Sequence, residues 1–258
     1  MTYGIIGVGA IGAAIVTGLC EGVKEAPSIV LSPRNARRAA ELASRLQTVR
    51  IAKSNQDVLD GSSVVLLCIR PQEAKSVLGG LKFSAEQAVV SMMAGVSIET
   101  LRTLVAPVQN IARAIPLPAV AARAGATPIF PPTDVAKALF DRLGHAIEVP
   151  NERAFDATSA STATVSAHFA YLNAICQWLM AQGVSETAAR RQVATTFAGL
   201  AAQLHDREDR APDFSELARD HATRGGTNEQ FLGVLEQARV FDAVHAGLDQ
   251  ILDRLTRR

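Results

Sequence analysis

The sequence predicts an α/β protein in which a doubly wound, mostly parallel sheet is followed by an all-helical region. Up to residue 149, short runs of β-branched residues alternate with Ala-rich segments of helical periodicity. Beyond Asn151 no further strand pattern occurs. A glycine-rich turn also joins the first expected strand to the first expected helix. Together these features indicate a Rossmann-type domain over residues 1–150 and an all-helical domain over residues 151–258.

The expected strands are six short runs, at residues 3–6, 28–31, 64–69, 88–91, 110–113 and 146–149. Helices are expected between them, for example over residues 35–46 and 97–105. In the C-terminal region, apolar stripes run through Val193, Phe197, Leu200 and Leu204, and again from Phe231 to Leu255. These stripes exceed what a small domain needs for its own core, so we expect a homodimer or larger homo-oligomer. The charged segment 205–210 is expected to be a solvated loop.

Composition excludes several classes of protein. The chain has 258 residues with 26 Lys plus Arg against 25 Asp plus Glu, so its charge gives no case for binding nucleic acid or an anionic membrane. No apolar run approaches the ~20 residues that a membrane span needs. The widely separated Cys20, Cys68 and Cys176 are expected to be reduced core residues. A cytoplasmic protein is therefore expected.

The glycine turn predicts a dinucleotide site. The segment Gly7, Val8, Gly9, Ala10, Ile11 and Gly12 fits the G-x-G-x-x-G pattern between an apolar strand and a helix. The first glycine permits the tight turn, the second lets the backbone approach a pyrophosphate, and the third permits close packing of helix on strand. The start of the helix adds N–H donors and a positive dipole end.

The second strand indicates which coenzyme is bound. An NAD site usually has Asp or Glu at the end of this strand, whereas Leu31 is followed by Ser32, Pro33, Arg34 and Asn35. A hydroxyl and a guanidinium suit the 2′-phosphate of NADP(H), which favours NADPH as the cofactor. The alternative is that Ser32 and Asn35 only cap the next helix while Arg34 is solvated.

With these residues in place, the chain resembles the pyrroline-5-carboxylate reductase family along nearly its whole length. After the glycine turn come Asn55, then Ile69-Arg70-Pro71-Gln72 in place of the family's Val-Lys-Pro-Gln, and Met93-Ala94-Gly95-Val96 in place of its Ala-Gly-Val segment. Further on, Arg113 to Pro116 with 125–127, Phe169-Ala170-Tyr171, and Gly225-Gly226-Thr227-Asn228 keep the family's spacing. The resemblance implies that Asn55, Ile69, Arg70, Pro71, Ala94 and Gly95 line the cofactor. It also implies NADPH-dependent reduction of Δ1-pyrroline-5-carboxylate to L-proline, by a dimer whose sites lie at the domain junction.

The substrate half departs from the family pattern at four positions: Leu117, His168, Phe169 and Asn228 stand where the family has Asn, Gly, Pro and Thr. Bulkier side chains thus replace small ones around the expected ring site. A related imine reductase with a different ring substrate therefore stays open. So does a paralogue that binds NADPH without catalysis.

The expected substrate site centres on Gly225, Gly226 and Thr227. A carboxylate can be held by backbone N–H groups at a helix start, and Thr227 with Gln230 forms the pattern of a capping box. Thr227 and Asn228 are the candidate catalytic residues, although both could serve only the helix start. His168 and Tyr171 share a helix face, so His168 is a candidate substrate contact and Tyr171 a candidate proton donor, with ordinary core packing as the alternative.

Two further enzyme classes share this type of first domain. The β-hydroxyacid dehydrogenases need a catalytic Lys in the helical part, and this chain has none after Lys137. The F420-dependent NADP oxidoreductases leave the Gly-Gly-Thr turn unexplained. The scattered histidines show no metal-ligand spacing, so no metal site is expected.

Overall fold

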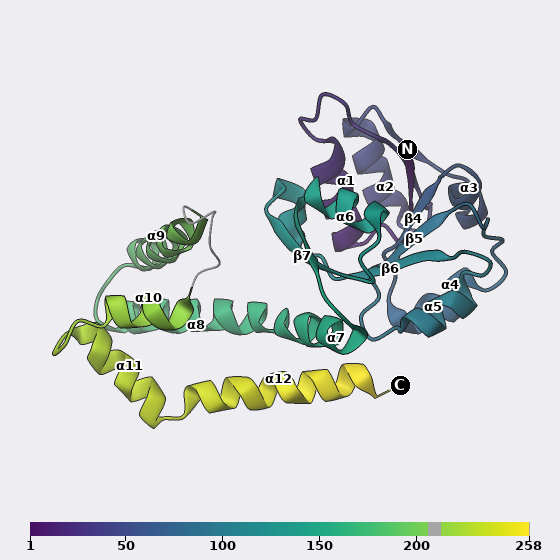
Figure 1. The fold of residues 1–258 in the computed structure, drawn as a ribbon. Helices are drawn as coiled ribbons and strands as arrows, with labels where there is room; N and C mark the ends of the chain where they lie inside the picture. Colours follow the sequence, from purple (N-terminus) through teal and green to yellow (C-terminus); the bar gives the residue numbers. More distant parts are fainter. Residues whose placement is uncertain (206–212, 258) are drawn as a thin grey trace. The chain divides into compact units, whose positions relative to one another are not determined.

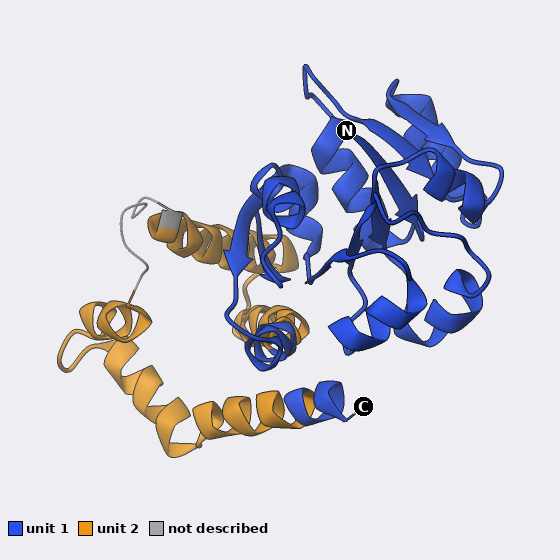
Figure 2. Cartoon of the chain, turned by 45° about the vertical axis from the view of Figure 1, so that its right-hand side comes forward, with its two compact units in different colours: residues 1–160, 252–258 blue, residues 161–251 orange. Residues whose placement is uncertain are grey.

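A computed structural model of the chain describes residues 1–205 and 213–257. Their contacts form two compact units (Figure 2), one of residues 1–160 with 252–258 and one of residues 161–251. The boundary at residue 150 stays a prediction. Most of the expected loop 205–210 lies outside the described residues, which resume at residue 213.

The first unit is built on an eight-stranded sheet of order β3-β2-β1-β4-β5-β6-β7-β8, of which Figure 1 labels β4 to β7. All neighbouring strands are parallel except β6 and β7, which are antiparallel. The strands are β1 (Thr2–Ile6), β2 (Ser28–Leu31), β3 (Val49–Ile51), β4 (Val64–Leu67), β5 (Ala88–Ser91), β6 (Asn110–Ala114), β7 (Gly125–Phe130) and β8 (Gly144–Glu148). The predicted fold class is confirmed, with β3 and β7 as additional strands.

Helices cover both faces of this sheet because its buried strands alternate between two apolar cores. Ile5, Leu31 and Leu66 belong to one core, which they share with α1 (Ala10–Cys20), α2 (Ala36–Arg45), η2 (Pro118–Ala122) and α6 (Asp134–Asp141). Ile6, Val65 and Leu67 belong to the other, with α3 (Asn55–Asp60), α4 (Ala74–Leu78) and α5 (Ile98–Leu104). A short helix, η1 (Pro71–Glu73), precedes α4.

The strand order reverses between β1 and β4. The chain moves from β1 outward to β2 and β3, then returns to β4 on the other side of β1 and continues outward to β5 and β6. Loops that leave the carboxyl ends of β1 and β4 therefore diverge, and in open α/β sheets the crevice between them is where ligands bind.

A buried arginine holds α7 (Glu152–Ser161) to the sheet. Arg113 of β6, fully buried, pairs with Glu152 at 2.9 Å and with Asp156 at 2.8 Å, and its guanidinium lies 4.3 Å from the centre of the Phe155 ring. Glu152 also accepts a hydrogen bond from the backbone N–H of Ile98, at the start of α5. This network anchors the first helix of the C-terminal region in the first unit.

The described part of the second unit consists of helices joined by short turns and contains no strand. It comprises α8 (Thr164–Ala181), α9 (Glu186–His205), α10 (Phe214–His221), α11 (Thr227–Gln237) and most of α12 (Val240–Thr256). The expected stripe from Phe231 to Leu255 is divided between α11 and α12, because the chain turns at Arg239, which has a positive φ of 54°. No helix in the described ranges is long and apolar enough to cross a bilayer.

Candidate functional site

A pocket of about 480 Å³ lies at the β1/β4 reversal point. Its lining comes from the loops after three strands, β1, β2 and β4, and consists of Gly7, Val8, Gly9, Arg34, Asn35, Ala36, Cys68, Ile69, Arg70 and Glu73. Seven of the residues expected to bind the cofactor are thus brought together: Gly7, Val8, Gly9, Arg34, Asn35, Ile69 and Arg70.

The three glycines of the turn meet three different constraints. Gly7 has a φ of +97°, and a Cβ there would lie 2.5 Å from the carbonyl oxygen of Cys68. A Cβ on Gly12 would lie 2.6 Å from the carbonyl oxygen of Gly7. A Cβ on Gly9 would meet no protein atom within 4 Å. Gly7 and Gly12 are therefore required by the fold itself, whereas a side chain on Gly9 would extend into open space at the pocket.

The start of α1 leaves backbone donors available. Gly9 is the N-cap residue and supplies no side-chain hydrogen bond. The first N–H groups of any helix have no partner within the helix and form a positive dipole end. Ala10 and Ile11 therefore present their amides beside the pocket, as an anion site requires.

Side chains after β2 hold the glycine turn in shape. The Ser32 hydroxyl accepts a hydrogen bond from the Gly7 N–H at 3.0 Å and is almost completely buried. The Asn35 amide donates to the Val8 carbonyl at 3.0 Å, and its oxygen accepts from the Arg38 N–H as the N-cap of α2. Of the two residues considered as caps, only Asn35 is one, and Ser32 instead braces the turn.

Glu73 is a pocket residue that sequence reasoning missed. Its Oε1 accepts hydrogen bonds from Arg34 at 2.6 Å and from Arg70 at 2.9 Å. Those two guanidiniums lower the pKa of the Glu73 carboxyl to about 2. The pairing of Arg70 with Glu73 at i,i+3 was available from the sequence, but the contact with Arg34 spans 39 residues and depends on the fold.

Cys68 lines the pocket as a thiol. Burial raises the pKa of this cysteine to about 12, and its Sγ lies 3.9 Å from the sulfur of Met92. At neutral pH the thiolate is a negligible fraction, so Cys68 contributes packing and no nucleophile. All three cysteines are free, and Cys20 and Cys176 are buried.

The other residues expected near the cofactor do not line this pocket. Asn55 begins α3 and Pro71 begins η1, while Ala94 and Gly95 form a turn after β5 in which Gly95 has a φ of +72°. The turns that hold Pro71 and Ala94–Gly95 follow β4 and β5, so these residues belong to the carboxyl-end side of the sheet.

The residues expected to contact the substrate occur in both units. Leu117 is the N-cap of η2 in the first unit. In the second, His168 and Tyr171 of α8 both approach Phe197 of α9 edge-on, with ring centroids 6.3 and 6.0 Å apart. The rings of His168 and Tyr171 thus share a helix face and a packing partner.

The Gly225–Asn228 turn forms the start of α11, but the expected capping box is wrong. The N-cap is Gly226, and the N–H of Gly225 is bound by Glu229 Oε2 at 2.7 Å. Thr227 is the first helical residue, so its side chain cannot take the N-cap role with Gln230. The amide of Asn228 donates to the His221 carbonyl at 3.0 Å and joins α11 to α10.

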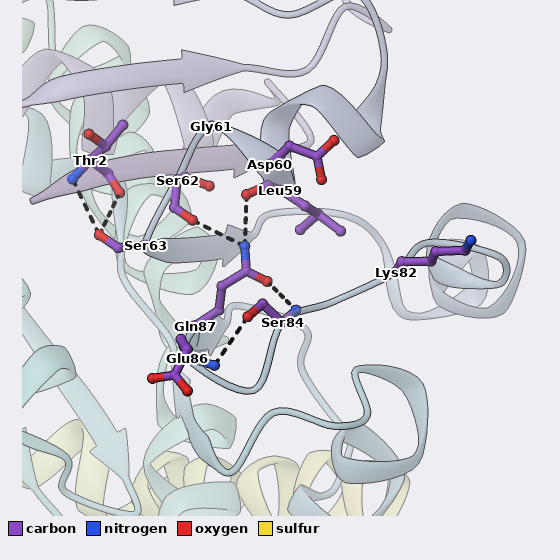
Figure 3. Close-up of a pocket in the computed structure, with 10 residues that line it drawn as sticks. All are labelled: Thr2, Leu59, Asp60, Gly61, Ser62, Ser63, Lys82, Ser84, Glu86 and Gln87. Carbon is purple, nitrogen blue, oxygen red and sulfur yellow. Dashed lines mark hydrogen bonds between the residues drawn. The ribbon is translucent and has the colours of Figure 1, made fainter.

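A second pocket lies at the opposite, amino-end edge of the sheet (Figure 3). Its central side chain is Gln87, whose amide donates to the carbonyls of Leu59 at 2.7 Å and Ser62 at 3.1 Å and accepts from the Ser84 N–H at 3.0 Å. These contacts use the Gln87 amide to close loops, and the pocket contains no glycine turn or helix start comparable with that of α1.

Comparisons with known proteins agree with this geometry. Residues 2–95 match the family model "NADP oxidoreductase coenzyme F420-dependent", and residues 152–257 match "Pyrroline-5-carboxylate reductase dimerisation". The pyrroline-5-carboxylate reductase of Mycobacterium leprae is 30% identical over 83% of this chain and 77% of its own length. The chain belongs to the pyrroline-5-carboxylate reductase family. The Synechocystis family member is 29% identical over 94% of both chains.

Solved structures of pyrroline-5-carboxylate reductases and of a reductive aminase share the fold. The 1-pyrroline-5-carboxylate reductase of Streptococcus pyogenes superposes with a TM-score of 0.83 over 100% of this chain and 99% of its own, at 24% identity. The Plasmodium falciparum pyrroline carboxylate reductase, solved with NADP bound, superposes with a TM-score of 0.81 over 99% of this chain and 97% of its own, at 17% identity. A reductive aminase from Aspergillus terreus, solved in complex with NADPH4, superposes with a TM-score of 0.64 over 99% of this chain and 90% of its own, at 17% identity.

Proposed function

We propose that this chain catalyses the NADPH-dependent reduction of a cyclic imino acid, Δ1-pyrroline-5-carboxylate to L-proline. The observation that carries the proposal is the open turn at Gly9, beside two arginines, at the reversal point of a reductase-family sheet. Residues 1–150 would form the coenzyme domain and residues 151–258 the helical substrate and dimerisation domain.

The pocket residues fit a nicotinamide coenzyme. Gly7 to Gly12 would hold the diphosphate with backbone amides, and Arg34 and Arg70 would hold the 2′-phosphate. Asn55, Ile69, Pro71, Ala94 and Gly95 would line the rest of the binding path. When bound, the coenzyme supplies the hydride for the reduction.

For the imine, the protein's task is positioning. The cyclic imine can arrive protonated, so the reaction needs little acid–base chemistry from side chains. Because Glu229 Oε2 and the Thr223 carbonyl already accept hydrogen bonds from the N–H groups of Gly225 and Gly226, the amides of Thr227 and Asn228 are among those left in the first turn of α11 for a substrate carboxylate. Gly225, at which a Cβ would point into open space, would let the ring approach them. Tyr171 and His168 would orient the ring, with Tyr171 as the proton donor.

A homodimer is proposed for the active form. In residues 161–251 the described hydrophobic core consists of only Cys176, Ala189 and Val193, whereas Phe169, Trp178 and Phe231 each expose more than half of their surface. A groove along α8 and α12 is also lined mostly by Val, Leu, Ile and Ala. Helices with this much exposed apolar surface need a partner. Light scattering should therefore give twice the monomer mass of 27.3 kDa or a higher multiple, and a stable monomer would contradict the dimer.

A related reaction on a larger ring is the second candidate. Leu117 and Phe169 replace smaller family residues, and Phe169 is 64% exposed. Such side chains could offer apolar contact to a six-membered imine. The same assay therefore includes piperideine-2-carboxylate.

The test is turnover by the purified protein, followed as loss of NADPH absorbance with each imine in turn. We expect turnover with pyrroline-5-carboxylate. Turnover with the six-membered imine alone would move the assignment to the second candidate. If NADPH binds but neither imine is reduced, the chain is a non-catalytic coenzyme-binding relative.

The substrate turn is tested by the double variant Thr227→Val with Asn228→Ala. We expect a higher KM for the imine, with NADPH affinity nearly unchanged. Since Asn228 also joins α11 to α10, a melting curve of the variant serves as the control for folding. Unaltered steady-state kinetics would remove the turn from the site.

A further inference from the structure

The mouth of the coenzyme pocket holds a carboxylate between two arginines. Arg34 comes from the loop after β2, Arg70 follows β4, and Glu73 ends η1. Both guanidiniums contact the same oxygen, Glu73 Oε1, at 2.6 and 2.9 Å. The arginine side chains are 62% and 77% exposed, whereas that of Glu73 is only 21% exposed. The carboxylate therefore lies inward of the two cations.

This arrangement leaves bonding capacity on all three groups. Each guanidinium has five N–H donors, of which the contact with Glu73 uses one. A carboxylate accepts at two oxygens, and no described residue donates to Glu73 Oε2. Because both arginines stabilise the charged form and lower the pKa of the Glu73 carboxyl, the carboxylate is ionised at neutral pH. The cluster thus offers a fixed anion and two partly unsatisfied cations to the same pocket.

The two nicotinamide coenzymes differ at the adenosine ribose in a way that this cluster can distinguish. NADH carries a 2′-hydroxyl, which donates a hydrogen bond to a carboxylate in many NAD sites. NADPH carries a 2′-phosphate, which guanidiniums attract and a carboxylate repels. Sites specific for NADPH gain from having no acidic group there, so Glu73 is not explained by NADPH binding alone.

We infer that Glu73 sets the coenzyme preference of this chain, by accepting the ribose 2′-hydroxyl of NADH and opposing the 2′-phosphate that Arg34 and Arg70 attract. The site therefore binds both coenzymes, with a smaller preference for NADPH than its two arginines alone would give. This inference rests on the proposed function, because it assigns a role within the same pocket.

The test compares dissociation constants for NADPH and NADH, measured by calorimetric titration of the full chain without substrate. The variant Glu73→Gln keeps the shape of the side chain and removes its charge. We expect the ratio of the NADH to the NADPH dissociation constant to rise about fivefold, the order expected for one exposed charge contact. Arg34→Ala should move the ratio in the opposite direction, by loss of NADPH affinity.

Two controls separate charge from shape and folding. Glu86→Gln removes one carboxylate at the amino-end pocket of the sheet (Figure 3) and should leave the ratio unchanged. Glu73→Asp keeps the charge and should remain close to the wild type in ratio. Melting temperatures of all variants verify that they fold.

Either of two results would overturn the inference. A ratio that stays constant in Glu73→Gln would mean that Glu73 does not reach the ribose. A ratio that falls would mean that the carboxylate helps NADPH by holding the arginines in place. In both cases the wild type still binds coenzyme and the proposed function survives. If the wild type binds neither coenzyme, the proposed function fails and the role of Glu73 fails with it.

Discussion

At the scale of single residues, the glycine turn separates the needs of the fold from those of a ligand. Gly7 and Gly12 lie against the protein's own backbone, at the carbonyls of Cys68 and Gly7, whereas Gly9 borders open space. Gly9 also has an ordinary extended backbone, with φ −83° and ψ −162°. Any residue could adopt this conformation, so apart from its modest advantage as an N-cap, the glycine at this position is best explained by a ligand.

This separation predicts opposite phenotypes for two alanine substitutions. Gly9→Ala should change the free energy of unfolding by less than about 1 kcal/mol, because two small effects oppose each other. Alanine lowers the conformational entropy of the unfolded chain, which stabilises the fold, but it is a poorer N-cap than glycine. It should weaken NADPH binding at least about tenfold by blocking the diphosphate, at a cost of ~1.4 kcal/mol. Gly12→Ala should destabilise the fold by about 1–3 kcal/mol through crowding against Gly7.

Urea unfolding and NADPH titration of both variants measure these effects. A Gly9→Ala protein that binds NADPH with wild-type affinity would show that the coenzyme diphosphate does not pass close to that residue. A Gly12→Ala protein of wild-type stability would show that the helix start can move away from the turn without cost.

Individual pocket residues were predictable where the reason was local. The glycine pattern, Arg34 and Asn35 all follow from short-range spacing around β1 and β2. Glu73 and the bracing role of Ser32 did not, because each depends on a contact made across the fold, over 39 and 25 residues. The capping box failed for a local reason, since Gly226 took the N-cap and Glu229 reached back to Gly225.

At the scale of elements, Arg113 joins three of them. Its guanidinium on β6 pairs with two carboxylates of α7, one of which also binds the first turn of α5. Asp156 is as buried as Arg113. Burying these charges is costly unless they remain paired, so the network commits α7 to one position on the sheet.

Arg113→Met should therefore destabilise the protein by about 3–5 kcal/mol, because it removes the buried guanidinium that pairs with the buried carboxylate of Asp156. Arg45 is a matched control, since it also pairs with two carboxylates, Glu21 and Glu41, but with its side chain 44% exposed. Arg45→Met should lower the free energy of unfolding by much less than Arg113→Met does. Denaturant unfolding of the two variants measures these changes. Equal losses of unfolding free energy would show that burial does not strengthen the ion pairs of Arg113.

The strands that sequence patterns missed share a physical reason. β3 is only three residues long and includes the charged Arg50, while β7 begins with Gly125 and contains Pro128. Neither has the β-branched run that marks the central strands: β3 is a short strand at the sheet edge, and the Gly and Pro of β7 interrupt its apolar pattern. The central strands were predictable since they are buried on both faces.

At the scale of the whole molecule, the fold class followed from the alternation of strand and helix patterns and from their end near residue 150. The family follows from that order together with the glycine turn, the segment after β4 and the Gly225–Asn228 turn. The substrate is less determined, because its expected contacts at Leu117, His168 and Asn228 are the positions at which this chain departs from the family pattern. The coenzyme site is thus the firmest basis for a test.

The most direct measurement is a calorimetric titration of the purified, folded chain with NADPH. We expect one site per chain with a dissociation constant of about micromolar order, typical of coenzyme and substrate sites, and markedly weaker binding in Gly9→Ala. The absence of binding by either nicotinamide coenzyme at millimolar concentration, in protein shown to be folded, would contradict it.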